Sequence, residues 1–256
     1  MSWRITGLSN LRRVVLVQLA KGAGLGLGIP ASRLIRIFNL NGGLTYRFLR
    51  ELESEEVAMQ VSRNVWTLKD THKARALAEL ALSDWRGLYS YFPETVPDVY
   101  YYMPDIPTTW FGGMAYRVVI ADPVLEGRIN PPGEYKVVYT SLRSRRFRFN
   151  WSLMMPVGGR EQSIADLLSY DPLWPVEQYI VWYYGDIDLD EVARRCSPYG
   201  LKRLASFLSF MKMSLGVPKA MEFNYLTLLD RDVYEEFLPK YFSWVFANGV
   251  DITRNI

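Results

Sequence analysis

Four acidic residues stand close together in the segment GDIDLDE: Asp186, Asp188, Asp190 and Glu191. Carboxylates at alternate positions offer the hard oxygen ligands that Mg²⁺ and Ca²⁺ prefer. A calcium loop, however, needs Gly at its sixth position, and Glu191 stands there. Acidic residues also favour the first turn of a helix because they complement its dipole. We therefore predict a helix start and no metal site, and keep a Mg²⁺-dependent enzyme as a third hypothesis.

The chain has one histidine and one cysteine, His72 and Cys196. No GxSxG motif accompanies the histidine, and a single chain with this inventory cannot build a Cys/His zinc site. Two arginines precede Cys196 and would lower a thiol pKa, but its apolar neighbours favour a buried, inert thiol. We predict a solvated His72, no catalytic residue and no cofactor, so the chain is not expected to be an enzyme.

Arginines offer a different chemistry in the segment LNGGLTYRFLREL, residues 40–52. At about 100° per residue, a helix over 44–54 places Thr45, Leu49 and Leu52 on one face. Tyr46, Arg47 and Arg50 then share the opposite face, where no core is available. The planar guanidinium can read guanine edges or bind phosphate, so this face is a candidate nucleic-acid surface.

The elements around this helix follow a recognisable order. Helical periodicity covers 10–20 and 30–38, the turn 39–43 precedes the helix 44–54, and 56–70 reads as a β-hairpin with Ser62-Arg63-Asn64 at its tip. The glycines of KGAGLGLG follow a helix rather than a strand, so we predict a flexible turn and no nucleotide site. Helix, helix, turn, helix and hairpin is the order of a winged helix-turn-helix, whose third helix enters the major groove.

This order assigns roles to particular side chains. Arg47 and Arg50 are expected to read bases, and Tyr46 to contact sugar or phosphate. The expected contacts to the DNA backbone are Arg12, Arg13, Arg63 and Lys69. Residues 1–75 hold 12 basic and 5 acidic residues, a net charge of +7, whereas residues 76–256 hold 18 and 22, a net charge of −4. A basic head on an acidic body is typical of a protein whose head alone meets a polyanion.

The rest of the chain predicts an α+β fold. A helix over 71–90 follows the hairpin, and residues 93–110 are rich in proline and tyrosine. The segment RSRRFRFNW alternates Arg146, Phe147, Arg148 and Phe149, which predicts a strand with one basic and one aromatic face. The predicted division is a winged helix-turn-helix domain over 1–75, a linker helix over 76–92, and a mixed sheet-and-helix domain over 93–256, with strands at about 111–155 and helices at about 161–245.

Two segments carry a resemblance to a known family. EQSIADLL (161–168), followed by IDLDEVARRCSPYGLKRLASFL (187–208), resembles the C-terminal part of AbiEi-like antitoxins of type IV toxin–antitoxin systems. That family has a winged head ending in a Gly-Val-Tyr-x-Leu strand, and here Asn64-Val65-Trp66-Thr67-Leu68 takes that place, with Asn and Trp as departures. The resemblance, over about 10–210, implies a repressor-like antitoxin that binds its own operator and opposes a nucleotidyltransferase-like toxin.

Composition limits the remaining choices. Hydrophobic residues make up 49% and charged residues 22%, which is enough to bury a core in a chain of 256 residues. One cysteine excludes an internal disulfide and fits a reducing interior, and Gln18 and Lys21 interrupt the first apolar run, so we expect cytoplasmic residence and no membrane span. The expected partners are double-stranded DNA and a cognate toxin. The alternative is a protein-interaction module that binds an acidic partner and not DNA.

Overall fold

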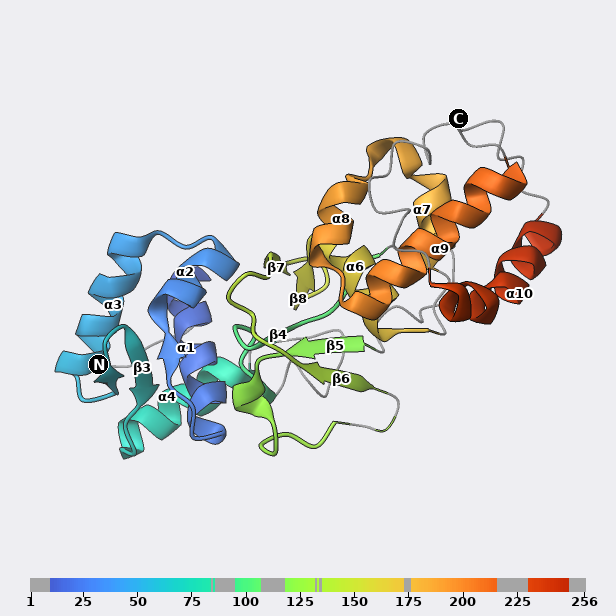
Figure 1. The fold of residues 1–256 in the computed structure, drawn as a ribbon. Coiled ribbons are helices and arrows are strands. Elements are labelled where there is room, and N and C mark those ends of the chain that lie inside the picture. Colours follow the sequence, from blue (N-terminus) through green and yellow to red (C-terminus); the bar gives the residue numbers. More distant parts are fainter. Residues whose placement is uncertain are drawn as a thin grey trace. The chain divides into compact units, whose positions relative to one another are not determined.

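The computed structural model describes residues 10–83, 85, 95–106, 118–131, 133, 135–172, 176–215 and 230–248. Helices and small antiparallel sheets alternate along the chain (Figure 1), which confirms the predicted α+β class. The chain divides into two compact units. The first comprises Met1–Met103 with Val119–Gly158, and the second comprises Pro104–Val118 with Gly159–Ile256.

The first unit begins with the helices and the hairpin that the sequence predicts. The elements in chain order are α1 (Asn10–Gly24), β1 (Ile29–Pro30), α2 (Ala31–Phe38), α3 (Gly42–Ser54), β2 (Ala58–Ser62), β3 (Val65–Leu68) and α4 (His72–Ser83). Both β1 and β2 pair antiparallel with β3, which lies between them. Helix α4 packs along α1, while residues 84 and 86–92 of the predicted linker helix lie outside the described residues.

The predicted flexible turn at the glycine-rich segment is wrong in its first half, because α1 continues to Gly24. Tight packing explains Gly22, where a Cβ would lie 2.7 Å from the side chain of Ile29, whereas a Cβ at Gly24 would meet nothing within 4 Å. The turn itself is short and uses a positive φ of 64° at Gly26. A Cβ at Gly28 would lie 2.5 Å from Val65, so this glycine lets β1 approach β3.

The first unit continues with five short strands. They are β4 (Tyr101–Tyr102), β5 (Val118–Ala121), β6 (Lys136–Tyr139), β7 (Phe147–Asn150) and β8 (Met155–Gly158), and they form the sheets β4-β5-β6 and β7-β8. Residues 107–117, which include the start of the predicted strand region at about 111, lie outside the described residues. An aromatic cluster joins α2 to β7, with the ring of Phe38 4.7 Å from that of Phe149 and Trp85 and Trp151 against both.

A buried polar cluster joins α1 to the segment before β4. Gln18, Lys21 and Asp98 are almost fully buried; the Asp98 carboxylate accepts from Gln18 and lies 3.1 Å from the Lys21 ammonium. Burial raises the pKa of Asp98, and the charge of Lys21 opposes that rise. Gln18 and Lys21, which interrupt the first apolar run of the sequence, thus share Asp98 as a buried partner. Among the described residues, no helix has the length and hydropathy of a bilayer-spanning segment.

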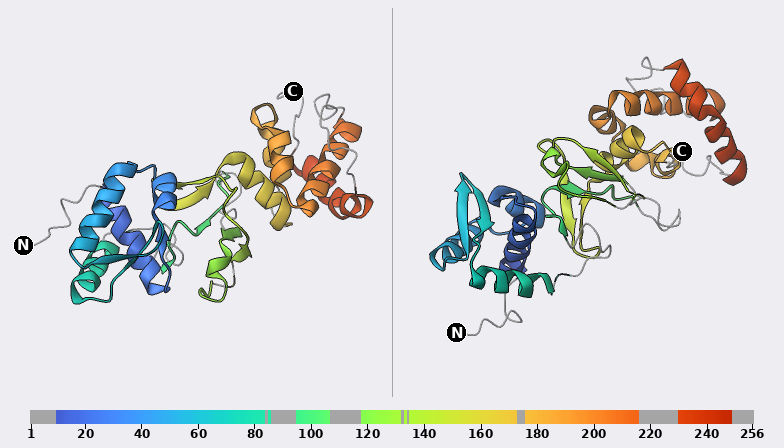
Figure 2. Two further views of the ribbon diagram at one scale, coloured as in Figure 1. Left: turned by 60° about the vertical axis from the view of Figure 1, so that its left-hand side comes forward. Right: turned by 90° about the horizontal axis from the view of Figure 1, so that it is seen from below.

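The second unit is helical in its described part. Its elements are α6 (Arg160–Tyr170), α7 (Val176–Trp182), the 3₁₀ turn η5 (Tyr184–Asp186), α8 (Leu189–Arg195), α9 (Pro198–Leu215) and α10 (Arg231–Asn248). Helices α6, α8, α9 and α10 match predicted helical segments, whereas α7 was not predicted. Helix α10 runs beside α9 in Figure 1 and in both views of Figure 2.

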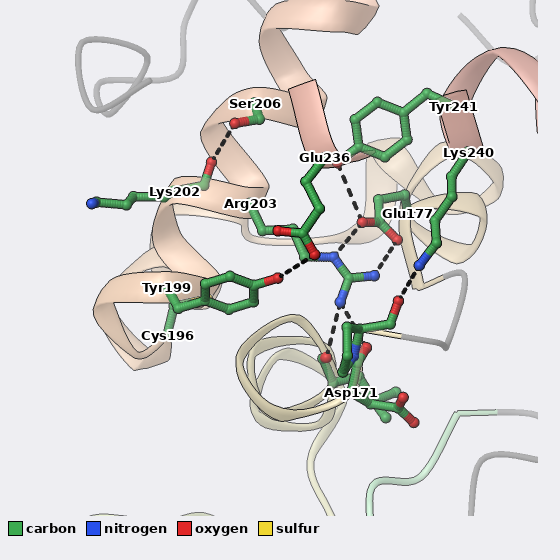
Figure 3. A network of polar contacts seen from close by, with 12 residues as sticks. Asp171, Glu177, Cys196, Tyr199, Lys202, Arg203, Ser206, Glu236, Lys240 and Tyr241 are labelled. Carbon is green, nitrogen blue, oxygen red and sulfur yellow. Dashed lines mark hydrogen bonds and ion pairs between the residues drawn. The ribbon is translucent and has the colours of Figure 1, made fainter. Parts of the chain in front are cut away.

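A buried ion pair holds these helices together (Figure 3). Arg203 of α9 is 1% exposed and donates from Nε and one terminal nitrogen to the two carboxylate oxygens of Glu177 on α7, at 2.5 and 2.8 Å. Its other terminal nitrogen donates to the carbonyl of Asp171, which follows α6. The Tyr241 hydroxyl of α10 donates to Glu177, and the ring of Phe237 covers the guanidinium at 4.5 Å. One arginine therefore ties four helices.

Candidate nucleic-acid interface

Helix α3 presents the face that the sequence predicts. Its start is capped by Asn41, whose side chain accepts from the amide of Leu44 at 3.0 Å. Thr45, Leu49 and Leu52 are buried, and Phe48 joins them. The remaining face of α3 is exposed, including Tyr46, Arg47 and Arg50.

The two arginines of this face have different surroundings. Arg50 lies over the buried ring of Trp66, 5.2 Å from its centroid, and pairs with Glu53 at 2.6 Å. Both side chains of that pair are in contact with solvent, so the pair contributes little and is readily exchanged for another anion. Arg47 makes no ion pair or hydrogen bond with any residue in the described part of the chain.

A polar junction joins α3 to the hairpin turn and to α2. The Asn64 side chain accepts from the Tyr46 hydroxyl at 2.5 Å and donates to the Ser32 hydroxyl at 2.8 Å. The backbone carbonyl of Asn64 also accepts from the amide of Ala31. Asn64 has a φ of 67°, a conformation that asparagine tolerates better than most residues. The turn that carries Arg63 is thereby fixed against both helices.

Three arginines without an ion-pair partner among the described residues lie on the elements that this junction joins. Arg63 precedes Asn64 in the turn, and Arg36 lies one helical turn after Ser32 on the exposed side of α2. Like Arg47, both are exposed and form no ion pair with another described residue. Sequence analysis missed Arg36, Ser32 and Asn64. The available signals were the i, i+4 spacing of Ser32 and Arg36 and an asparagine in a tight turn.

The other predicted backbone contacts lie elsewhere. Arg12 pairs with Glu51 at 3.0 Å and lies over the ring of Phe48, so it joins α1 to α3. Arg13 is half-buried, and its Nε is buried without a hydrogen-bond partner in the described structure. Lys69 follows β3 at the opposite end of the hairpin from Arg63, 3.8 Å from Glu56. The structure thus brings Tyr46, Arg47, Arg50 and Arg63 together. It leaves Arg12, Arg13 and Lys69 away from that group.

The acidic residues around Asp188 and the thiol of Cys196, the other two candidates for chemistry, have structural roles. Asp188 caps α8 by accepting from the Glu191 amide at 2.9 Å, and Glu191 pairs with Arg194 and Arg195, as the helix-start prediction requires. No cluster of metal-binding side chains occurs among the described residues. Burial, followed by the charge of Asp166, raises the pKa of the Cys196 thiol to about 12. That thiol is protonated at neutral pH and is a poor nucleophile.

Comparisons with protein-family models, with curated proteins and with solved structures found no match to this chain. A functional interpretation therefore depends on the geometry of the α3 face, the hairpin turn and the resemblance seen in the sequence.

Proposed function

We propose that the first unit binds double-stranded DNA through a winged helix-turn-helix and that the protein is a sequence-specific transcriptional regulator. The element order α1-β1-α2-α3-β2-β3 supports this proposal, with α3 as the recognition helix and the β2–β3 hairpin as the wing. The observation that carries it is the solvent-exposed Tyr46, Arg47 and Arg50 face of α3.

The proposed contacts follow from the surroundings of each side chain. The major groove, about 12 Å wide, admits a helix such as α3. Arg47 has no internal partner to give up and contacts base edges. Arg50 exchanges Glu53 for a base or phosphate while the Trp66 ring keeps its stem oriented. Tyr46 is held by Asn64 and contacts the sugar-phosphate backbone.

The wing and α2 supply contacts that do not depend on sequence. Arg63 reaches a phosphate from the hairpin turn, and Arg36 reaches one from the exposed side of α2. Because Asn64 links the turn to both helices, these two cations and α3 are positioned before the duplex arrives. Such preorganisation reduces the entropy that binding costs.

The narrower role of antitoxin rests on the resemblance to AbiEi-like regulators. It predicts that an adjacent reading frame encodes a nucleotidyltransferase-like protein that arrests growth when expressed alone. Co-expression of this chain should restore growth. If growth stays arrested with this chain folded and present, the antitoxin role is wrong, although DNA binding could still hold.

The DNA-binding proposal is tested by titrating the full chain against a labelled random-sequence duplex between 50 and 200 mM salt. We expect log K to fall linearly with log salt, with a slope near −0.9 for each phosphate contacted. Arg47→Gln with Arg50→Gln should weaken binding strongly. The matched control is Arg148→Gln, which removes an exposed, unpaired arginine of β7 and should leave affinity within about twofold. Failure to bind duplex at 50 mM salt would contradict the proposal and favour the protein-interaction alternative.

A further inference from the structure

Strand β7 carries a second set of arginines in the first unit. Phe147 and Phe149 are buried; the ring of Phe147 stacks on Tyr102, and that of Phe149 packs at a tilt against Phe38. Arg146 and Arg148 alternate with them and are exposed on the opposite face. Because α2 packs on the aromatic face, the β7 arginines point away from α2.

The charge of this face is not neutralised nearby in the chain. Residues 135–158, which end the first unit, contain five basic residues and no acidic one. Arg146 and Arg148 form no ion pair with another described residue, and neighbouring β8 consists of Met-Pro-Val-Gly. Six carboxylates elsewhere in this unit already have cationic partners: Glu51, Glu53, Glu55, Glu56, Asp70 and Asp122.

The backbone of β7 has an open side. The amide of Met103 donates to the carbonyl of Pro156, and the amide of Gly158 donates to the carbonyl of Met103. Pro156 and Gly158 of β8 therefore direct these backbone groups away from β7. The backbone amide and carbonyl of Val157, between them, face its partner Arg148 on β7. By the same alternation, the amides and carbonyls of Phe147 and Phe149 face the outer edge. Within the described residues no strand pairs with that edge.

We propose that the outer edge of β7 is a docking site for an extended acidic peptide, which adds as a strand. Its backbone pairs with Phe147 and Phe149, as in other cases of strand addition. Two of its carboxylates, spaced i and i+2, lie on the same face as Arg146 and Arg148 and pair with them. Charge complementarity and the free edge select this partner over nucleic acid, which needs no strand geometry. The docking site is separate from the proposed DNA interface and does not depend on it.

The test is fluorescence anisotropy with the full chain and the labelled peptide Thr-Glu-Val-Glu-Val-Glu-Thr. We expect saturable binding that weakens at least tenfold in the Arg146→Glu/Arg148→Glu variant. A peptide with lysine in place of glutamate should bind that variant and not the native chain, which also shows that the variant is folded. A peptide with proline in place of both valines keeps its charge but cannot donate to the edge, and should bind at least tenfold more weakly.

Two matched controls complete the experiment. Arg36→Glu reverses an exposed, unpaired arginine of the same unit and should leave peptide affinity within twofold. The Arg146→Glu/Arg148→Glu variant should bind duplex within about threefold of the native chain. Equal binding of the proline peptide, or peptide affinity unchanged by charge reversal, would overturn the proposal. The arginines would then serve only to keep the edge from pairing with other strands. Failure of the native chain to bind duplex would count against the DNA proposal alone, whereas loss of duplex binding in the Arg146→Glu/Arg148→Glu variant would show that the β7 arginines belong to the DNA interface.

Discussion

The surroundings of individual arginines separate those available to a ligand from those used by the fold. Arg12 and Arg203 each have a carboxylate partner and an aromatic ring, and each joins helices. Arg47 and Arg63 are exposed and have no ion-pair partner in the described structure. Arg47 and Arg63 can therefore bind a phosphate or a base without breaking an ion pair within the described structure.

Arg63→Gln removes a proposed phosphate contact from the wing. Because phosphates are the same at every base pair, we expect affinity to fall by the same factor for all duplex sequences. The slope of log K against log salt should become less steep by about 1. Salt titrations on two unrelated duplexes measure both effects. A loss confined to one sequence would show that Arg63 reads bases instead.

Asn64→Gly tests the polar junction without straining the turn, since glycine adopts a φ of 67° readily. The turn loses its side-chain bonds to Tyr46 and Ser32, so Arg63 is no longer held in place. We expect a uniform loss of duplex affinity. A double-mutant cycle with Arg63→Gln should show that the two losses do not add. Fully additive losses would mean that Asn64 does not act through Arg63.

Cys196 should react slowly with iodoacetamide at pH 8 in the folded protein and quickly in urea. The physical reason is burial, which raises the thiol pKa from 9.0 to about 12 and keeps the group protonated. The shifted thiol pKa also contributes to the free energy of unfolding. This contribution is present in full below pH 9 and is lost as pH rises from 9 to 12, because in that range the thiol ionises only in the unfolded chain. Mass spectrometry of the alkylated chain follows the reaction. Equal rates in both states would contradict a buried thiol.

At the scale of elements, the sequence predicts those with one buried and one exposed face. The 3.6-residue period separates Leu49 from Arg47 on α3, and strict alternation separates Phe149 from Arg148 on β7. Helix α7 escaped prediction because its side chains from Val176 to Val181 are all buried, including the polar Glu177 and Gln178, so it has no exposed face to set a helical period. The extension of α1 through Gly22 brings that glycine against Ile29 of β1, a contact that local sequence does not reveal.

Polar contacts between distant residues account for the rest. Glu177 and Arg203 are 26 positions apart, and Asn64 is 18 and 32 positions from its two partners. No periodicity links such pairs. The candidate α3 face could therefore be predicted, whereas the junction that positions the β2–β3 turn could not.

Arg203→Met should destabilise the second unit by about 3–5 kcal/mol, because it leaves the Glu177 carboxylate buried without its cation. Urea unfolding followed by tryptophan fluorescence measures the change. Arg231→Gln is the control, since it breaks an exposed pair with Glu235 on α10 and should leave the transition unchanged. A similar small effect for both variants would show that the buried Arg203–Glu177 ion pair does not hold the helices of the second unit together.

At the scale of the whole molecule, charge and fold are distributed unequally. The first 75 residues carry a net charge of +7, and their described carboxylates are largely used in ion pairs with nearby cations. The excess positive charge therefore resides on exposed arginines such as Arg36, Arg47 and Arg63. This distribution would accelerate association with a polyanion and make it sensitive to salt.

The proposed function requires that the exposed face of α3 reads DNA sequence. The most direct measurement compares native and Arg47→Ala full-length chains on a duplex selected from a random pool and on an unselected duplex. We predict that Arg47→Ala loses about 1–3 kcal/mol of the difference in binding free energy between the two duplexes. Unchanged affinity of Arg47→Ala for both duplexes would contradict the claim.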